Sequence, residues 1–278
     1  MDRYAVFGNP VSHSKSPQIH QWFAEKAGQV LDYSAQLVEL GEFEPAAKAF
    51  FDADGLGLNI TVPFKQEAFE FADSLTERAR RAGAVNTLAR QTDGKILGDN
   101  TDGYGLVTDI RDNLSWPIAA RRVLVLGAGG AVRGVLAPIL AEQPAEILIA
   151  NRTGSRAEDL AREFSDLGKI DGMGYQQLAD LTRSFDLVIN GTSLSLSGEI
   201  PPIPVALLTA ETCVYDMMYA QEPTAFMSWA DKLGCQTSDG LGMLVNQAAE
   251  SFYVWRGIRP PTSELIKTLR KNFKKKIK

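Results

Sequence analysis

The feature that most constrains this chain is an apolar run that breaks into glycines and then resumes as a helix. Val123-Leu124-Val125-Leu126 is followed by Gly127-Ala128-Gly129-Gly130-Ala131, with Val132 where a Gly-x-Gly-x-x-Gly pattern has its third glycine. Such a run is typical of a parallel strand buried on both faces, and glycines let the backbone turn and approach a ligand. The segment therefore predicts a strand, turn and helix that hold a pyrophosphate, the alternative being a close turn without a ligand.

The residues after the next apolar strand indicate which dinucleotide binds. The strand at 146–150 ends in Asn151-Arg152-Thr153, and Arg156 follows one turn later. An acidic residue there would bind the ribose 2′-hydroxyl of NAD, whereas an arginine accommodates the 2′-phosphate of NADP. The sequence predicts NADP, the alternative being a solvated arginine at a helix start.

Length and charge limit the class of protein. A chain of 278 residues is long enough for two α/β domains, and a net charge of −5 gives no general attraction to nucleic acid or membranes. The first residues lead directly into an apolar strand without signal-peptide features, so we expect a cytoplasmic protein with no membrane association. Two cysteines and two histidines, without metal-ligand spacing, argue against a disulfide framework and a metal site.

The second half of the chain alternates strands and helices. Strands are predicted at 122–126, 146–150, near 170, at 185–190 and at 212–216, with helices at 131–141 and 155–165. This pattern predicts a Rossmann-type, doubly wound sheet. Met217 follows its last strand, beside the expected nicotinamide position, although methionines there also serve as core filler.

The first half predicts a second, mainly parallel α/β sheet. Strands are expected at 4–8, 33–38 and 57–62, with helices from Pro17 and around 43–51. Thr92-Asp93-Gly94 is typical of a hairpin, which we place antiparallel at the edge of this sheet.

Polar residues gather where these strands end. Ser14 and Ser16 precede a helix and suit an anion, although Ser16 could equally cap the helix. Asn59, Thr61 and Lys65 follow an apolar strand, at the end where open α/β sheets bind ligands. Lys65 as an ordinary surface lysine is the alternative.

Two later segments complete the expected organisation. Asp102 lies in a polar, glycine-rich stretch before the predicted helix 106–114 and is a candidate site residue. The alternative is that Thr101 or Asp102 only caps this helix. Asp239-Gly240-Leu241-Gly242-Met243 opens a helix carrying Gln247. If this helix returns to the first domain, residues 1–101 plus 240–278 bind substrate, residues 102–239 bind the dinucleotide, and a cleft lies between them. The lysines in the C-terminal segment 271–278 are typical of the C-terminal end of a helix, and we prefer this interpretation to nucleic-acid binding.

Over nearly its whole length the chain resembles the shikimate dehydrogenase family. The matching segments occur in the family's order and spacing: Ser14-Lys15-Ser16-Pro17, Asn59-Ile60-Thr61-Val62-Pro63-Phe64-Lys65, Gly83-Ala84-Val85-Asn86-Thr87, Asn100-Thr101-Asp102-Gly103, the Gly127 loop, Asn151-Arg152-Thr153 and Asp239-Gly240-Leu241-Gly242-Met243. The resemblance implies reversible NADPH-linked reduction of 3-dehydroshikimate to shikimate, within chorismate and aromatic amino acid biosynthesis.

The resemblance also implies roles for single residues. Lys65 and Asp102 would form the catalytic pair, either of which could transfer the proton. The substrate would contact Ser14, Ser16, Thr61, Asn86, Asp102, Tyr219 and Gln247, to which we add Asn59. The cofactor would contact Gly127, Ala128, Gly129, Gly130, Ala131, Asn151, Arg152, Thr153, Arg156, Met217, Gly240 and Met243.

Two other functions remain open from sequence. A quinate/shikimate dehydrogenase that uses NAD would share these motifs, but Arg152 and the lack of an acid beside it argue against NAD. A non-catalytic NADP-binding regulator would have no need of both Lys65 and Asp102. The sequence leaves open whether the protein is a monomer or homodimer, and how well it accepts quinate.

Overall fold

The chain folds into two compact α/β units. The computed structural model describes residues 1–275. One unit comprises Met1–Gly105 and Val245–Thr268, and the other comprises Leu106–Leu244 with the described residues from Leu269 onward. The functional domain boundaries predicted at residues 102 and 240 stay a prediction.

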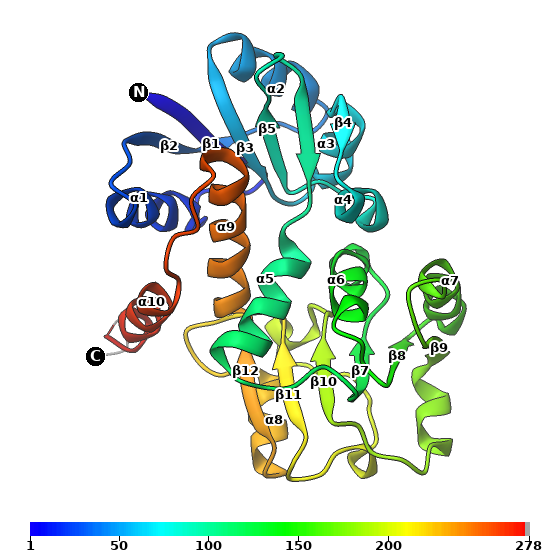
Figure 1. Ribbon diagram of the computed structural model, residues 1–278. Coiled ribbons are helices and arrows are strands. Elements are labelled where there is room, and N and C mark those ends of the chain that lie inside the picture. The colour runs from blue at the N-terminus through cyan, green and yellow to red at the C-terminus, as the bar shows by residue number, and fades with distance from the viewer. Residues whose placement is uncertain (276–278) are drawn as a thin grey trace. The chain divides into compact units, whose positions relative to one another are not determined.

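The first unit is built on a six-stranded, mainly parallel sheet (Figure 1). The strand order is β2-β1-β3-β5-β6-β4, with β5 antiparallel to both its neighbours. Ala5 and Phe7 of β1 belong to a buried hydrophobic cluster that also contains Phe43 and Phe50. The strands are β1 (Asp2–Gly8), β2 (Leu31–Leu37), β3 (Gly55–Ile60), β4 (Ser74–Leu75), β5 (Thr87–Arg90) and β6 (Ile96–Asp99).

The helices of the first half of the chain follow these strands and bring polar residues to their ends. Helix α1 begins directly after the serine loop that follows β1, and α3 begins at Lys65. The helices are α1 (Ser16–Lys26), α2 (Phe43–Asp52), α3 (Lys65–Phe71), α4 (Glu77–Ala82) and α5 (Asp102–Thr108). The last two helices of the chain are α9 (Leu241–Arg256) and α10 (Ser263–Lys275).

The predicted hairpin forms, but its expected place at the sheet edge is wrong. Strands β5 and β6 pair in antiparallel fashion around residues 92–94 as expected. However, Ser74 and Leu75 form the short strand β4, which pairs with β6 and occupies the edge. A two-residue strand carries no alternating pattern by which the sequence could indicate it.

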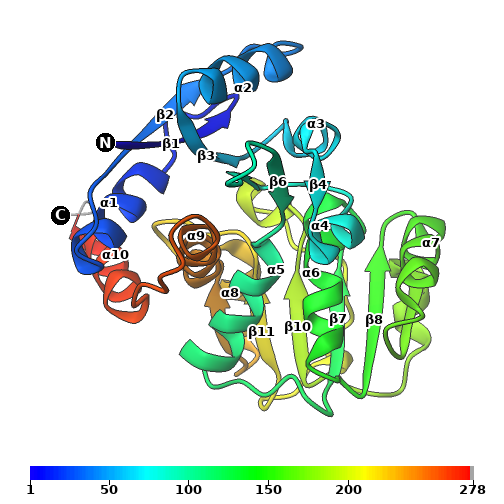
Figure 2. The same cartoon turned by 45° about the horizontal axis from the view of Figure 1, so that its top comes forward.

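The second unit is built on a six-stranded sheet whose strands are all parallel. Its order is β12-β11-β10-β7-β8-β9, and Figure 2 shows β11, β10, β7 and β8 side by side. In sequence order this is the 3-2-1-4-5-6 arrangement of the Rossmann fold, whose order reverses beside β7. The strands are β7 (Arg122–Leu126), β8 (Glu146–Asn151), β9 (Ile170–Gly174), β10 (Leu187–Asn190), β11 (Cys213–Asp216) and β12 (Gln236–Asp239).

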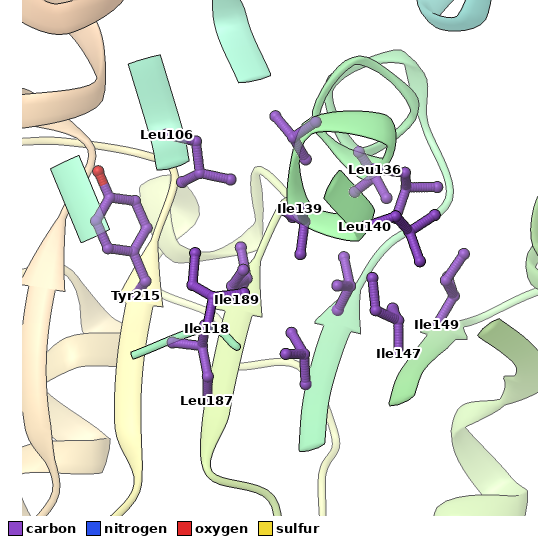
Figure 3. Close-up of a cluster of buried hydrophobic side chains, with 14 of the residues drawn as sticks. Leu106, Ile118, Leu136, Ile139, Leu140, Ile147, Ile149, Leu187, Ile189 and Tyr215 are labelled. Atoms are coloured by element: carbon purple, nitrogen blue, oxygen red, sulfur yellow. The ribbon is translucent and has the colours of Figure 1, made fainter. Parts of the chain in front are cut away.

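Helices pack against this second sheet and bury an aliphatic core. Figure 3 shows side chains of α6 above those of β8 and β10, including Leu136, Ile147 and Ile189. The helices are α6 (Gly130–Ala141), α7 (Gly154–Phe164) and α8 (Ala225–Lys232), with a π-helical turn at Asp109–Asn113 and 3₁₀ turns at Tyr175–Asp180, Leu194–Ser197 and Val205–Leu207. Among the described residues, no helix combines the length and apolarity needed to cross a membrane.

Candidate active site

The centre of the candidate site is a contact between a lysine and an aspartate. Lys65 is the first residue of α3 and Asp102 is the first residue of α5. The Lys65 Nζ lies 2.6 Å from Asp102 Oδ2, with the two side chains 32% and 17% exposed. Partial burial strengthens such a charge-assisted hydrogen bond relative to a fully exposed pair. The structure therefore brings together the two residues predicted as the catalytic pair.

The side-chain amide of Asn86 donates to the other oxygen of this carboxylate. Asn86 Nδ2 donates to Asp102 Oδ1 at 2.8 Å and to Gln247 Oε1 at 3.3 Å. Thr101 Oγ1 also donates to Gln247 Oε1, at 3.4 Å. Asp102, Asn86 and Gln247 thus form one connected group, although they are far apart in sequence.

The serine loop before α1 lies in the same unit. Ser14 Oγ accepts a hydrogen bond from the Ser16 backbone N–H at 3.3 Å, and the Ser16 side chain is buried. Helix α1 has Lys15 as its N-cap residue and no side-chain cap hydrogen bond. The alternative interpretation of Ser16 as the N-cap is therefore wrong, and it is the Ser14 hydroxyl that binds the first N–H of the helix.

The two polar residues near the end of β3 differ in their surroundings. Thr61 follows the strand, and its methyl group packs so closely over Gly8 that a Cβ there would clash. Asn59, in contrast, is buried, and both ends of its amide are hydrogen-bonded to protein groups. Its role as a substrate ligand stays a prediction.

An ion-pair network that joins α4, β6 and α9 was not predicted from the sequence. Arg78 Nη2 lies 2.5 Å from Asp99 Oδ2, and Arg78 Nη1 lies 3.0 Å from Glu250 Oε1. Burial alone would raise the pKa of Asp99, but the hydrogen bonds and charge of Arg78 outweigh it and lower that pKa. Asp99 therefore stays ionised near the start of the segment that carries Asp102.

The glycine loop of the second unit has the geometry that a pyrophosphate requires. Gly127 has φ of +103°, which favours glycine, and its N–H donates to Ala150 O at 2.8 Å. Gly129 caps α6 and Gly130 begins it, and a Cβ on either would meet no protein atom within 4 Å. With Ala131 also exposed, the first amides of α6 are open to an anion.

Two arginines lie next to this loop at the carboxyl end of β8. Arg152 and Arg156 are exposed, and neither takes part in an ion pair among residues 1–275. Asn151 Nδ2 donates to Thr153 O at 3.0 Å, which shapes the turn before α7. Arg152 also borders a pocket of about 370 Å³, lined by Gly174, Tyr175 and Gln177. A guanidinium group without an ion-pair partner is free to donate charge-assisted hydrogen bonds to a phosphate group.

The remaining predicted residues of the second unit include Gly240 and Met217, which are in contact. A Cβ on Gly240 would clash with the Met217 carbonyl, and its N–H donates to Met218 O at 3.0 Å. Met217 belongs to the buried core, and Met243 packs against that core while remaining half-buried. Burial, together with the charge of Asp239, raises the pKa of Tyr219. Met217, Gly240, Met243 and Tyr219 thus all belong to the second unit.

Comparison with known proteins assigns the family. Three family models match the chain: the shikimate dehydrogenase substrate binding domain at residues 6–88, shikimate/quinate 5-dehydrogenase at 110–197 and the shikimate 5′-dehydrogenase C-terminal domain at 240–270. The NADP(+) shikimate dehydrogenase of Cellvibrio japonicus is 59% identical over 276 residues, covering 99% of each chain. This chain belongs to the shikimate dehydrogenase family.

Further relatives agree with that assignment. The NADP(+) shikimate dehydrogenase of Saccharophagus degradans is 56% identical over 277 residues, covering 98% of this chain and 100% of its own. The structure of shikimate 5-dehydrogenase from Thermus thermophilus in complex with NADP(H) and shikimate is 33% identical, with a TM-score of 0.84, covering 98% of this chain and 99% of that one. The family thus extends over both units.

Proposed function

We propose that this chain catalyses the reversible NADP-linked interconversion of shikimate and 3-dehydroshikimate. The observation that carries the proposal is the 2.6 Å contact between Lys65 Nζ and Asp102 Oδ2, in the unit that also contains the serine loop. An oxidoreductase of this class needs a proton donor for the alkoxide that forms as the carbonyl is reduced. Its relatives at 56% and 59% identity bear the name of that NADP-dependent enzyme.

Lys65 is the proton donor in this proposal, and Asp102 orients it. Asp102 accepts hydrogen bonds at both oxygens, from Lys65 and from Asn86, as an ionised carboxylate does. The Lys65 ammonium has three N–H groups, of which one faces Asp102 and the others can reach a ligand. In the oxidation direction, the neutral Lys65 amine takes the proton from the substrate hydroxyl and becomes the ammonium again.

Polar groups of the first unit bind the substrate. Ser14 and Ser16 hold the carboxylate. Thr61, Asn86, Asp102 and Gln247 bind the ring hydroxyls, and the contacts of Asn86 with Asp102 and Gln247 support this grouping. Because the partner is a small polar acid, hydrogen bonds at fixed positions supply most of the specificity.

The second unit fits an NADP molecule. The open space at Gly129 and Gly130 admits a pyrophosphate close to the backbone, with Gly127, Ala128 and Ala131 completing the loop. Arg152 and Arg156 bind the 2′-phosphate, assisted by Asn151 and Thr153, while Met217, Gly240 and Met243 border the nicotinamide. The cofactor, when bound, supplies or accepts the hydride.

A direct assay tests the proposal. Purified protein is mixed with shikimate or quinate and with NADP or NAD, and the absorbance of the reduced nicotinamide is followed. We expect turnover with shikimate and NADP to exceed every other combination. No turnover with shikimate in the presence of either cofactor would remove the proposed activity.

Substitution of both loop serines tests the carboxylate site. We expect Ser14→Ala/Ser16→Ala to weaken shikimate binding by roughly 10- to 150-fold for each lost hydrogen bond, because bonds to a charged group contribute about 1.5–3 kcal/mol. Calorimetric titration with shikimate measures this, and the NADP affinity of the same variant is the internal control. Undiminished shikimate affinity would exclude the loop from the substrate site.

Gly130→Ala should separate stability from cofactor binding. An added Cβ meets no protein atom within 4 Å, so the free energy of unfolding should stay equal or rise by up to about 1 kcal/mol. The same methyl group occupies space close to the pyrophosphate, and NADP affinity should fall at least ~10-fold. Urea unfolding and NADP titration measure the two effects.

Gly94→Ala is the matched control. Gly94 also has open space around it, but its φ of +86° strains any residue with a Cβ. This variant should lose about 1–2 kcal/mol of stability and keep its NADP affinity. Equal NADP affinity in Gly130→Ala and wild-type protein would contradict the assignment of the loop.

A further inference from the structure

A buried histidine lies at one end of a polar network that leads to the catalytic pair. His20 of α1 is fully buried, and its ring stacks on Tyr33 with centroids 4.4 Å apart. Its Nε2 lies 3.0 Å from Asn59 Oδ1, while its Nδ1 has no hydrogen-bond partner in the described structure. Burial lowers the pKa of His20 to about 3, so the ring is neutral near pH 7. Because Asn59 Oδ1 can only accept, the proton resides on Nε2.

The orientation of the Asn59 amide is determined by its partners. Its Nδ2 lies 3.3 Å from the backbone oxygen of Asn86, which can only accept a hydrogen bond. The same Nδ2 donates to Ser251 Oγ at 3.0 Å. Its Oδ1 accepts from Tyr33 Oη at 2.7 Å and from His20. A buried amide with every position used fixes the positions of its neighbours.

Ser251 extends this network from Asn59 to the residues around Asp102. It lies on α9, fully buried, and its Oγ is 2.7 Å from Thr87 Oγ1 and 3.2 Å from Thr101 Oγ1. Asn86 Oδ1 accepts from Thr87 Oγ1 at 2.8 Å and from the Thr101 N–H at 2.9 Å. Asn86 is therefore held at its backbone oxygen by Asn59 and at its side-chain oxygen by the two threonines.

We propose that His20, Asn59 and Ser251 are positioning residues that hold Asn86, and through it the Asp102 carboxylate, in line with Lys65. The proposal rests on the proposed function, because it assigns these residues to the same reaction. None of the three offers a polar atom to a ligand except the unpartnered Nδ1 of the buried His20. Their effect reaches the reacting atoms through Asn86, whose Nδ2 is 2.8 Å from Asp102 Oδ1, and through Thr101, which Ser251 contacts and which directly precedes Asp102.

Ser251→Ala is the first test, because it removes one oxygen atom and retains the helix. We expect turnover with saturating shikimate and NADP to fall roughly 3- to 10-fold, since small displacements of catalytic groups are costly. The KM for NADP should stay unchanged. With shikimate deuterated at the reacting carbon, the isotope effect on turnover should rise, because the chemical step becomes slower.

Two variants of His20 test the other end of the network. His20→Phe keeps an aromatic ring against Tyr33 but removes the Nε2 donor, and turnover should fall by a similar factor. His20→Gln carries an amide N–H at nearly the same distance from the backbone and should restore turnover to within twofold of wild type. A purely structural role would not distinguish the two variants in this way.

A stability control separates positioning from general destabilisation. Phe50→Leu changes the aromatic core of the same unit, where the Phe50 ring packs on Phe7 and Phe51. We expect it to lower the melting temperature as much as Ser251→Ala or more, without lowering turnover measured well below that temperature.

The proposal fails if Ser251→Ala keeps the turnover and the isotope effect of the wild type. It likewise fails if Phe50→Leu loses as much turnover as Ser251→Ala does. It also fails if His20→Gln is no more active than His20→Phe. Each of these results requires active wild-type protein, so they remain distinct from failure of the proposed function, which the wild-type assay alone reveals.

Discussion

Lys65→Ala is expected to lower turnover by roughly 10²- to 10⁴-fold, while shikimate still binds within several-fold of the wild-type affinity. The ammonium contributes most as charge develops on the substrate oxygen, and less to the neutral hydroxyl of bound shikimate. Steady-state kinetics gives the turnover, and calorimetric titration with shikimate gives the affinity. The variant should therefore lose turnover while it keeps most of its affinity for shikimate.

Lys95→Ala is the matched control for this result. Lys95 lies at the hairpin, with its side chain 69% exposed and 3.9 Å from Asp93 Oδ2. Its replacement should alter neither turnover nor affinity, since an exposed ion pair contributes little. Wild-type turnover in Lys65→Ala would show that the 2.6 Å contact with Asp102 is structural, and that the proton comes from elsewhere.

Arg152→Ala is expected to raise the KM for NADP by roughly 10- to 150-fold and to leave the KM for NAD nearly unchanged. The expected loss is that of one hydrogen bond to a charged group, about 1.5–3 kcal/mol. NAD has no phosphate at that position and therefore loses nothing. Parallel titrations of both cofactors at saturating shikimate provide the comparison.

Arg162→Ala, on the helix α7 that follows Arg152, controls for the loss of a positive charge. Arg162 is 73% exposed and pairs with Asp159, away from the carboxyl end of β8. Its replacement should leave both cofactors unaffected. If Arg152→Ala instead raised the KM for NADP and NAD equally, the arginine would act on the adenine or the fold. A wild-type preference for NAD would contradict the phosphate site itself.

Strands that consist of apolar runs could be predicted from the sequence, whereas strands without such runs could not. Residues 123–126 and 147–149 are buried without exception, and the parallel α/β arrangement around them is confirmed. Strand β12 consists of Gln-Thr-Ser-Asp and pairs only with β11 at the sheet edge. Nothing in four polar residues indicates a strand. Its position follows from the pairing, which is a property of the folded sheet.

The helix after Asp102 shows how local patterns fail at an irregularity. An uninterrupted helix was expected at 106–114, but the structure has α5 ending at Thr108 and a π-helical turn at Asp109–Asn113. Asp109 is buried there and accepts a hydrogen bond from Tyr215 at 2.7 Å. A buried carboxylate bonded to a residue of another strand cannot be recognised from helical periodicity.

In the candidate site too, residues within local sequence motifs could be predicted, whereas contacts between residues far apart in the sequence could not. The motifs containing Lys65 and Asp102 predicted the catalytic pair, and the glycine-rich segment predicted the turn that it forms. Contacts such as Asn59 with Ser251 join residues that are 192 positions apart. Asparagine and serine are common in turns and caps, so neither suggests such a contact by itself. These residues are recognisable only once the fold has placed them together.

The discontinuous first unit imposes an order on biosynthesis. Residues 245–268 complete this unit, and Trp255 Nε1 donates to Leu88 O at 2.9 Å while its ring fills the space beside Gly57. As the chain leaves the ribosome, the sheet strands of this unit emerge first, and the helix that covers them emerges only after nearly all of the second unit. Domains of nascent chains usually finish folding in the order of synthesis; here the part made first is completed last.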